Sequence, residues 1–261
     1  MAEALVLCDV TEDIAVVTLN RAQALNALSD GLLAALKEAL GRIAADERIK
    51  VVVIRGAGKV FCAGHDLKEM QAGRAAEDKG AAYFADLFSR CGEIMQMIPQ
   101  MPQVVIAQVH GIATAAGCQL VASCDMAVAD EHTRFGVNGV NIGLFCSTPM
   151  VALTRNLPRK QAFEMLTTGE FINAARALDL GLINRIASED LERETLDLAR
   201  TVAGKLGAAL RIGKRAFYDQ IDLPLAQAYA HTGAVMVENM LLRDTDEGIA
   251  AFIEKRRPDW A

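Results

Sequence analysis

The sequence predicts an α/β domain built from repeated strand–strand–helix units. The main observation is that three fully apolar runs of strand length, at 51–54, 104–107 and 126–129, are each followed by a glycine-containing or short turn and then by helical sequence. Short continuous apolar runs of this kind are typical of buried strands. The composition agrees, because 52 % apolar and 23 % charged residues exclude a disordered chain. A chain of 261 residues suffices for one large domain, or for one domain with an appendage.

The N-terminal region predicts a hairpin followed by a helix. Residues 5–10 and 14–19 are the two expected strands, with a turn at Glu12 and Asp13. Apolar residues then recur at helical spacing from position 28, and Ser29 or Asp30 is the expected N-cap.

The most apolar stretch of the chain, residues 104–122, is interrupted by Gln108, His110 and Gln119. These polar residues favour a buried strand and helix over a membrane span. A further short extended segment is expected around Phe135.

The last third of the chain is predicted to be mostly helical. Its amphipathic stripes fit packing on the same chain or on another subunit, and periodicity leaves both interpretations open. The expected helices cover residues 159–167, 174–180, 190–206, 208–218, 226–242 and 247–255.

Charge and cysteine usage exclude several classes of protein. With 27 Lys and Arg against 33 acidic residues, the net charge of −6 argues against a general nucleic-acid binder. No C-x-x-C pair or zinc-finger spacing occurs, so we expect no metal site and reduced, buried thiols. The first ten residues lack the basic segment of a signal peptide, and together these features predict a cytoplasmic protein. The six cysteines are Cys8, Cys62, Cys91, Cys118, Cys124 and Cys146.

Three familiar sequence motifs are excluded, because the residues that each one requires are missing. A dinucleotide fingerprint beginning at Gly56 would need glycine where Phe61 stands, and a phosphate loop would need Ser or Thr where Val60 follows Lys59. A Gly-x-Ser-x-Gly nucleophile elbow is also absent from the sequence.

Two passages, residues 60–70 and 110–120, share a pattern in which an apolar strand gives way to small residues and then to a helix. Asp66 and Glu69 resemble a capping box, so a helix is expected directly after His65. Backbone amides at helix starts are free donors, and two that converge would form an oxyanion hole. Two tight turns with small residues for packing explain the same pattern, and the residues alone leave both interpretations open.

Five segments of the sequence carry a resemblance to a known family: residues 26–28, 61–70, 115–125, 135–136 and 252–258. With these landmarks in family order, the whole chain resembles the crotonase, or enoyl-CoA hydratase/isomerase, family. A narrower similarity, over residues 113–125 and 143–149, is to the enoyl-CoA-hydratase-domain proteins that lack the catalytic glutamates.

The resemblance implies a crotonase-like spiral of ββα units, with a core over residues 1–200 and a helical oligomerisation region over 201–261. It implies an enzyme by family, assembled as a homotrimer or a dimer of trimers. The ligand would be an acyl thioester of coenzyme A, with no permanently bound cofactor, no metal, no nucleic acid and no membrane as partner. Carried onto this sequence, the oxyanion-hole amides belong to His65 and Ala116.

The resemblance also implies a path for coenzyme A. Arg21, Lys255 and Arg256 are candidates for its phosphates, although solvated surface charge explains single Lys and Arg residues equally well. The other implied contacts are Ala24, Leu25, Ala63, His65, Asp66, Leu67 and Phe252.

This sequence departs from the family at the acid–base positions. The two family glutamates correspond to Gln119 and Gly139, and a carboxylate used by related isomerases corresponds to Ser147. General acid–base catalysis contributes roughly 10²–10⁴-fold per group, so we expect weak or absent hydration. Restoring both carboxylates, as Gln119→Glu with Gly139→Glu, is expected to confer hydratase activity.

Other interpretations of these positions stay open. Cys146 or the His65 side chain could take part in chemistry, and a decarboxylase of a malonyl-type thioester is one alternative. A non-catalytic acyl-CoA-binding protein is the other. Cys146 could equally be a small buried residue, and Gln119 a polar group that bridges within its helix.

Overall fold

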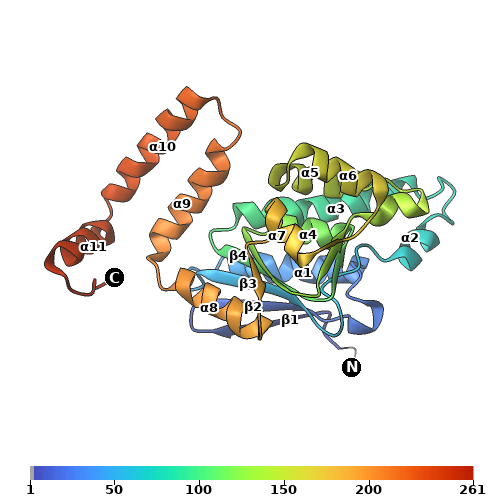
Figure 1. Ribbon diagram of the computed structural model, residues 1–261, viewed down its shortest axis with the longest axis horizontal. Helices are drawn as coiled ribbons and strands as arrows, with labels where there is room; N and C mark the ends of the chain where they lie inside the picture. The colour runs from blue at the N-terminus through green and yellow to red at the C-terminus, as the bar shows by residue number, and fades with distance from the viewer. Residues whose placement is uncertain (1–2, 261) are drawn as a thin grey trace.

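The computed structural model describes residues 3–260 of the chain. Within this part of the chain, the strands form a six-stranded sheet in the order β1-β2-β3-β4-β6-β9 and a three-stranded sheet in the order β5-β7-β8 (Figure 1). The strands are β1 (Val6–Thr11), β2 (Ile14–Leu19), β3 (Val51–Gly56), β4 (Val104–Val109), β5 (Ile112–Thr114), β6 (Met126–Asp130), β7 (Arg134–Gly136), β8 (Ile172–Asn173) and β9 (Arg185–Ala187).

Helices cover both faces of the large sheet and make up nearly all of the last third of the chain (Figure 1). They are η1 (Ala22–Ala24), α1 (Asp30–Ala44), α2 (Leu67–Gly73), α3 (Ala81–Gln100), α4 (Ala116–Ser123), η2 (Asn138–Ile142), α5 (Ser147–Asn156), α6 (Arg159–Thr168), α7 (Ala174–Leu180), α8 (Leu191–Ala203), α9 (Gly207–Gln220), α10 (Leu225–Met240) and α11 (Arg243–Glu254).

The large sheet begins with the predicted hairpin, in which β1 pairs antiparallel with β2. From β2 to β9 its strands are parallel. Alternate residues face two different cores: Val52 and Ile54 pack on the side of α1 and α3, whereas Val51 and Val53 pack on the side of α8. The runs of the sequence are continuously apolar because both faces of these strands are buried.

The chain winds as a spiral in which a strand of the large sheet is followed by a short extended segment of a second layer and then by a helix. The units β4-β5-α4 and β6-β7-α5 are complete. Earlier turns contribute single parallel bridges to the second layer, Leu28 with His65 and Cys62 with Ala113. The predicted strand–strand–helix repetition is therefore confirmed, and the second layer brings the two small-residue passages together.

Side chains cap the helices that flank these passages. The Ser29 hydroxyl accepts from the third amide of α1, and the Asp66 carboxylate accepts from the amides of Lys68 and Glu69 at the start of α2. The predicted capping box is only half formed. The Glu69 carboxylate accepts from the Asp30 amide at 2.7 Å, because the start of α1 lies within its reach.

Helix α3 had no counterpart among the elements expected from the sequence. Its buried residues Leu87, Cys91, Ile94 and Ile98 follow the three- and four-residue spacing of a helix face. Pro99 lies in its last turn.

The helices after β9 fall into two groups. Helix α8 packs on the large sheet through Leu198 and Ala199. Helices α9 to α11 extend away from the sheets (Figure 1), as an arm with no buried residue in α10 and only Ala251 buried in α11. The boundary predicted between residues 200 and 201 lies inside α8, and the oligomerisation role of the region after it stays a prediction. Residues 1, 2 and 261, at the ends of the two predicted regions, lie outside the described residues.

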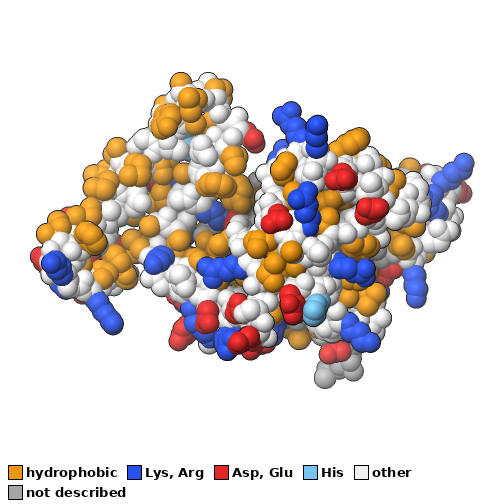
Figure 2. Space-filling model, in the orientation of Figure 1, with side chains coloured by type: hydrophobic (Ala, Val, Ile, Leu, Met, Phe, Trp, Pro, Cys, Tyr) orange, Lys and Arg blue, Asp and Glu red, His pale blue; other side chains and the backbone are white. Residues whose placement is uncertain are grey.

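The arm carries many exposed apolar side chains, visible as the orange surface over α10 and α11 in Figure 2. The most exposed are Leu225, Tyr229, Met236, Val237, Leu241, Phe252 and Ile253.

The cysteines were expected to be reduced and buried. All six cysteines are free, and five are buried as expected, but Cys8 is exposed because it lies on the edge strand β1.

The apolar stretch after residue 104 forms β4, β5 and α4. Within residues 3–260, no helix combines the length and the hydropathy needed to cross a bilayer.

Candidate active site

The two small-residue passages lie directly against each other. The Cys62 amide donates to the Ile112 carbonyl at 3.2 Å, and the Thr114 amide donates to the Cys62 carbonyl at 3.0 Å. A Cβ atom on Gly117 would lie 2.3 Å from the Cys62 carbonyl oxygen, so the start of α4 can approach this closely only with glycine there.

The His65 and Ala116 amides remain free donors within residues 3–260. On one side of His65, the Gly64 carbonyl accepts from the Leu28 amide; on the other, the Asp66 amide donates to the Leu28 carbonyl. The His65 amide between them has no acceptor among the described residues. Ala116 is the first residue of α4, where an amide has no intrahelical acceptor. A Cβ atom built on Gly64 would lie 3.4 Å from the Ala116 nitrogen, so the two amide-bearing segments face each other.

The residue before this second amide has a strained backbone. Ala115 has φ 49° and ψ −120°, whereas Ala116 has no positive φ. The oxyanion-hole amide was assigned to Ala116, but the glycine-like conformation belongs to the residue before it, Ala115. Strain of this kind costs about 1–3 kcal/mol and often accompanies functional sites.

A cavity of about 320 Å³ opens in front of these amides. Among the described residues its wall contains no Asp, Glu, Lys or Arg; His65 and Cys146 are its ionisable side chains. The lining residues are Ala63, His65, Leu67, Met70, Phe88, Thr114, Ala115, Ala116, Asn138, Gly139, Asn141, Ile142, Leu144, Phe145, Cys146, Ser147, Thr148 and Pro149.

The His65 imidazole is neutral near pH 7. Burial lowers its pKa from the usual value, and neither ring nitrogen has a hydrogen-bond partner among residues 3–260. The ring makes an edge contact with Phe88, with 5.7 Å between the ring centres. Both ring nitrogens are buried, so the imidazole must turn toward the cavity before it can exchange a proton with a bound ligand.

Cys146 lies at the same wall and is 6 % exposed. Burial raises the pKa of its thiol, and the Gly139 amide only partly offsets that rise. The thiol is therefore protonated near neutral pH and is a poor nucleophile.

Gly139 lines the cavity in a position that leaves no room for a side chain. A Cβ atom there would lie 2.3 Å from the Leu144 carbonyl oxygen and 2.8 Å from the Cys146 sulfur. Any side chain at this position displaces the backbone around Leu144, so the structure argues against restoring hydratase activity by Gly139→Glu, which stays to be tested.

Gln119 is buried in α4, with 3 % of its surface exposed, and is not among the cavity-lining residues. Its Oε1 atom has no hydrogen-bond partner among residues 3–260, so a bridging role for this oxygen is not seen.

The residues expected to contact coenzyme A are only partly brought together. Ala63 and Leu67 line the cavity beside His65, whereas Ala24, Leu25 and Asp66 do not.

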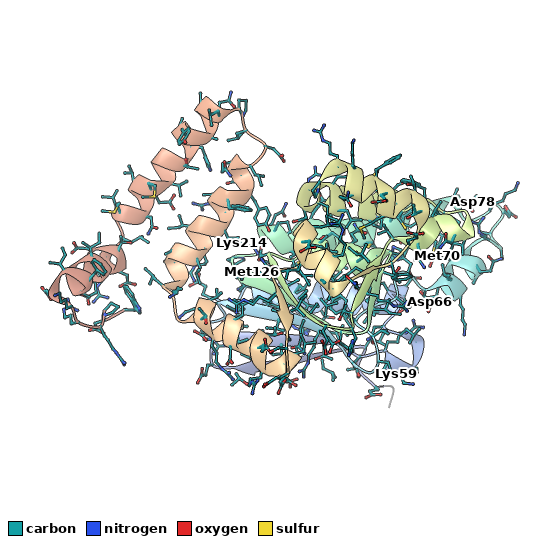
Figure 3. The ribbon with its side chains drawn as sticks, viewed as in Figure 1. Lys59, Asp66, Met70, Asp78, Met126 and Lys214 are labelled. Carbon is teal, nitrogen blue, oxygen red and sulfur yellow. The ribbon has the colours of Figure 1, made fainter. Side chains whose placement is uncertain are left out.

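Arg21 is engaged in a structural ion pair near the start of α2. Its guanidinium lies 2.7 Å from the Asp66 carboxylate and also donates to the Ala27 carbonyl. Although burial acts to raise the pKa of Asp66, hydrogen bonds from Arg21 and from two α2 amides hold it below its usual value. Figure 3 labels Asp66 and Met70 at this end of the fold.

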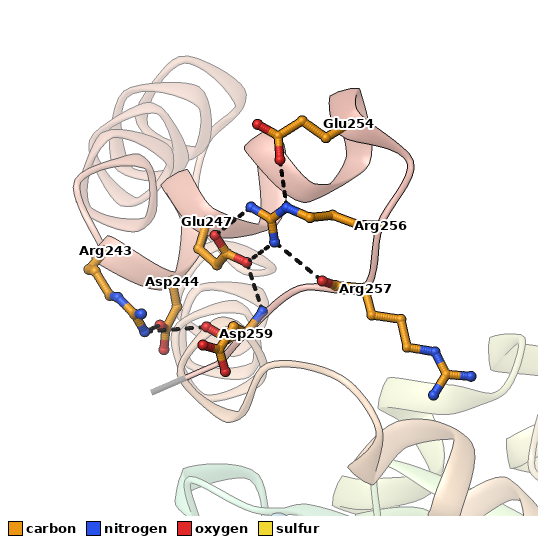
Figure 4. A network of polar contacts seen from close by, with 7 residues as sticks. All are labelled: Arg243, Asp244, Glu247, Glu254, Arg256, Arg257 and Asp259. Carbon is orange, nitrogen blue, oxygen red and sulfur yellow. Dashed lines mark hydrogen bonds and ion pairs between the residues drawn. The ribbon is translucent and has the colours of Figure 1, made fainter.

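The tail residues lie in the arm rather than at the cavity of the same chain. Phe252 is 84 % exposed in α11, and Lys255 ends that helix. The Arg256 guanidinium is held by Glu247, at 2.9 Å, and by Glu254 (Figure 4). Hydrogen bonds from Arg256 lower the pKa of Glu247 to about 2.

Sequence reasoning missed part of the apolar cavity wall. Met70 and Phe88 come from α2 and α3, and Ile142 comes from η2. The helical spacing within residues 81–100 could have indicated Phe88. Among the described residues no cluster of three or more His, Cys, Asp or Glu side chains is arranged to hold a metal ion.

Comparison with known proteins identifies the family of the chain. Residues 9–261 match the family model described as enoyl-CoA hydratase/isomerase. The chain is 46 % identical over 237 residues to human enoyl-CoA hydratase domain-containing protein 3, mitochondrial, covering 90 % of this chain and 77 % of that protein.

Two crystal structures are similar over nearly the full length. An enoyl-CoA hydratase from Mycobacterium smegmatis has a TM-score of 0.95 at 52 % identity, covering 99 % of each chain. Human enoyl coenzyme A hydratase domain-containing protein 3 has a TM-score of 0.91 at 44 % identity, covering 98 % of this chain and 100 % of that one. The predicted crotonase-like fold is confirmed by these likenesses.

The expectation of a cytoplasmic protein is contradicted. The relatives from mouse, human and Xenopus laevis are named as mitochondrial, which points away from a cytoplasmic location. The absence of a basic N-terminal segment was a weak guide, because it addresses secretion alone.

The match over residues 9–261 and the relatives at 44–52 % identity show that the chain belongs to the enoyl-CoA hydratase/isomerase, or crotonase, family.

Proposed function

We propose that this protein binds an acyl-CoA thioester and stabilises its enolate. The thioester oxygen accepts hydrogen bonds from the His65 and Ala116 amides, and the acyl chain enters the cavity lined by Met70 and Phe88. The observation that carries the proposal is the pair of free amides at the wall of a cavity that, among the described residues, is lined by no Asp, Glu, Lys or Arg side chain. Fixed donors at a developing oxyanion lower its energy, because they need no reorganisation.

Hydration of an enoyl thioester by this site is weak or absent. Water addition needs a base for the water and an acid for the α carbon, and the described cavity wall carries no carboxylate. By family resemblance the two glutamates correspond to Gln119 and Gly139. Gln119 lies outside the wall, and Gly139 has no space for a side chain.

Calorimetry with crotonyl-CoA tests binding separately from turnover. We expect crotonyl-CoA to bind more tightly than free coenzyme A. We also expect the conjugated thioester absorbance to be lost no faster with the protein than in buffer. Absence of acyl-CoA binding contradicts the proposal as a whole, whereas efficient loss of absorbance contradicts its non-hydrating part.

Decarboxylation of a malonyl-type thioester is a second candidate, favoured by the partnerless His65 imidazole in the cavity wall. The bond between the α carbon and the carboxylate breaks, carbon dioxide leaves, and the electron pair enters the thioester enolate. His65, once its ring has turned toward the cavity, then passes a solvent proton to the α carbon. Carbon dioxide release from methylmalonyl-CoA, lost in His65→Gln, tests this candidate; no release from the parent protein contradicts it.

We also propose that the arm mediates assembly into a homotrimer or a dimer of trimers. Members of this family bind acyl-CoA and commonly form oligomers. The exposed apolar side chains of α10 supply a contact surface, because apolar area of this extent is seldom left in water. Light scattering after size-exclusion chromatography should give three or six times the mass of one chain, and a monomer contradicts the proposal.

A further inference from the structure

Two polar side chains in the cavity wall are joined by one hydrogen bond. The Thr114 hydroxyl donates to the Asn138 amide oxygen at 2.7 Å, and both residues line the cavity. Thr114 is 8 % exposed and Asn138 is half-buried, so the bond is partly shielded from water and orients the Asn138 amide.

This bond leaves the nitrogen of the Asn138 amide as the group available to a ligand. An asparagine side chain has one acceptor oxygen and one donor NH₂ group, and Thr114 occupies the oxygen. Within residues 3–260 the Asn138 nitrogen has no hydrogen-bond partner. The wall therefore presents an oriented, uncharged donor.

The donor lies close to the oxyanion-hole amide of Ala116. Thr114 pairs with Gly136 in the second sheet, and the Ala115 amide donates to the Gly136 carbonyl. Asn138 follows Gly136 by two residues, and its side chain returns to Thr114. Ala116 and Asn138 line the same cavity, so an acyl thioester held at the Ala116 amide shares that cavity with the Asn138 nitrogen.

We propose that the Asn138 amide nitrogen is a specificity-determining donor that recognises an oxygen acceptor on the third carbon of the acyl chain. This inference rests on the proposed function, since it assigns the preferred acyl class at the same site. An oxygen on that carbon, as in a 3-oxoacyl thioester, accepts the hydrogen bond. A saturated chain of equal length covers the donor without offering it an acceptor, which is unfavourable.

Thr114 is a positioning residue for this recognition. Removing its hydroxyl frees the amide to rotate and present either its oxygen or its nitrogen to the ligand. Thr114→Val keeps the shape of the side chain and removes the hydrogen bond. Asn138→Leu keeps a similar volume and removes the donor itself.

The test compares acetoacetyl-CoA with butyryl-CoA, which have equal chain lengths, by calorimetry on the full-length protein. We expect the parent protein to bind acetoacetyl-CoA about 5–10-fold more tightly, the ratio expected for one neutral hydrogen bond. Asn138→Leu should reduce this ratio to about one with similar binding of butyryl-CoA. Thr114→Val should give an intermediate ratio, whereas the matched surface variant Thr167→Val should leave it unchanged.

The outcomes separate the two proposals. Equal binding of both thioesters by the parent protein, or a ratio retained in Asn138→Leu, overturns the role of Asn138 and leaves acyl-CoA binding in place. Failure to bind either thioester overturns the proposed function, and the role of Asn138 with it. Thermal unfolding of each variant verifies that the fold is intact, and an unfolded Asn138→Leu is replaced by Asn138→Asp, which retains the acceptor for Thr114 and removes the donor.

Discussion

The Lys214 ammonium lies 2.6 Å from the Asp125 carboxylate and joins the first helix of the arm to the core. Lys214 also donates to the carbonyls of Ile98 and Gln103, and the Tyr218 hydroxyl donates to the other Asp125 oxygen at 2.7 Å. Figure 3 labels Lys214 on the side of α9 that faces the core. Burial lowers the pKa of Lys214, and the charge is retained through its pairing with Asp125.

Lys214→Met should destabilise the protein strongly. The substitution leaves Asp125 as a buried charge without its cation, and breaking a buried pair costs about 3–5 kcal/mol. The free energy of unfolding from urea titration measures the loss. As a matched control, Lys37→Met breaks the exposed pair with Glu93 and should cost about 1 kcal/mol or less. Equal costs for the two substitutions would show that Lys214 is not a buried anchor.

Gly139→Ala should destabilise the cavity wall. The added methyl group overlaps the Leu144 carbonyl, and overpacking of this kind costs about 1–3 kcal/mol. Gly213→Ala is the control, because its Cβ would meet no atom within 4 Å in the middle of α9. It should be neutral or stabilise by up to about 1 kcal/mol. A Gly139→Ala protein as stable as the parent would show that the backbone around Leu144 moves at little cost in free energy.

The double variant Gln119→Glu with Gly139→Glu should gain no hydratase activity. A glutamate side chain in place of Gly139 could not fit without moving residues 144–146, and position 119 does not face the cavity. Crotonyl-CoA hydration measured from its absorbance provides the test, with calorimetric binding recorded beside it. A folded double variant that hydrates crotonyl-CoA efficiently would contradict this account of the wall.

Ala115→Gly should stabilise the protein. Glycine adopts φ 49° and ψ −120° without the strain that alanine bears, a relief of about 1–3 kcal/mol, and the greater freedom of the unfolded chain offsets about 0.4–1 kcal/mol of it. Ala113→Gly, two residues earlier in β5, has no positive φ and should destabilise. Urea unfolding midpoints compare the two variants, and a loss of stability in Ala115→Gly would show that no strain is relieved there.

Stability should fall as the pH drops below the unfolded pKa of histidine, near 6.5. Burial lowers the folded pKa of His65, so the unfolded chain binds a proton that the folded state resists. The contribution is present above pH 6.5 and is lost as the pH falls toward the folded pKa. Urea titrations between pH 7.5 and about 5.5 should show that the free energy of unfolding falls more steeply with decreasing pH for the parent than for His65→Gln. Parallel plots of this free energy against pH for the two proteins would contradict the prediction.

Much of the fold follows from local sequence signals. The strands β3, β4 and β6 are continuous apolar runs because both of their faces are covered, and the start of α2 is marked by Asp66. The predicted capping box is only half formed, because the contact of Glu69 with the start of α1 is a tertiary contact that spacing cannot show.

The site was harder to predict than the fold. His65 and Ala116 could be placed by family resemblance, but the strain at Ala115 and the contact of Gly139 with Leu144 depend on backbone approach in space. The engagement of Arg21 by Asp66 is likewise invisible in the sequence, since the two residues are far apart along the chain.

The measurement that tests the central claim most directly is the carbonyl ¹³C resonance of butyryl-CoA labelled at its first carbon, free and bound. Butyryl-CoA has no double bond to hydrate, so the signal reports polarisation of the thioester without turnover. If the His65 and Ala116 amides bond to the thioester oxygen, the resonance should move downfield on binding, because electron density is drawn from the carbonyl carbon. A bound thioester whose resonance stays at its position in water would contradict the oxyanion hole.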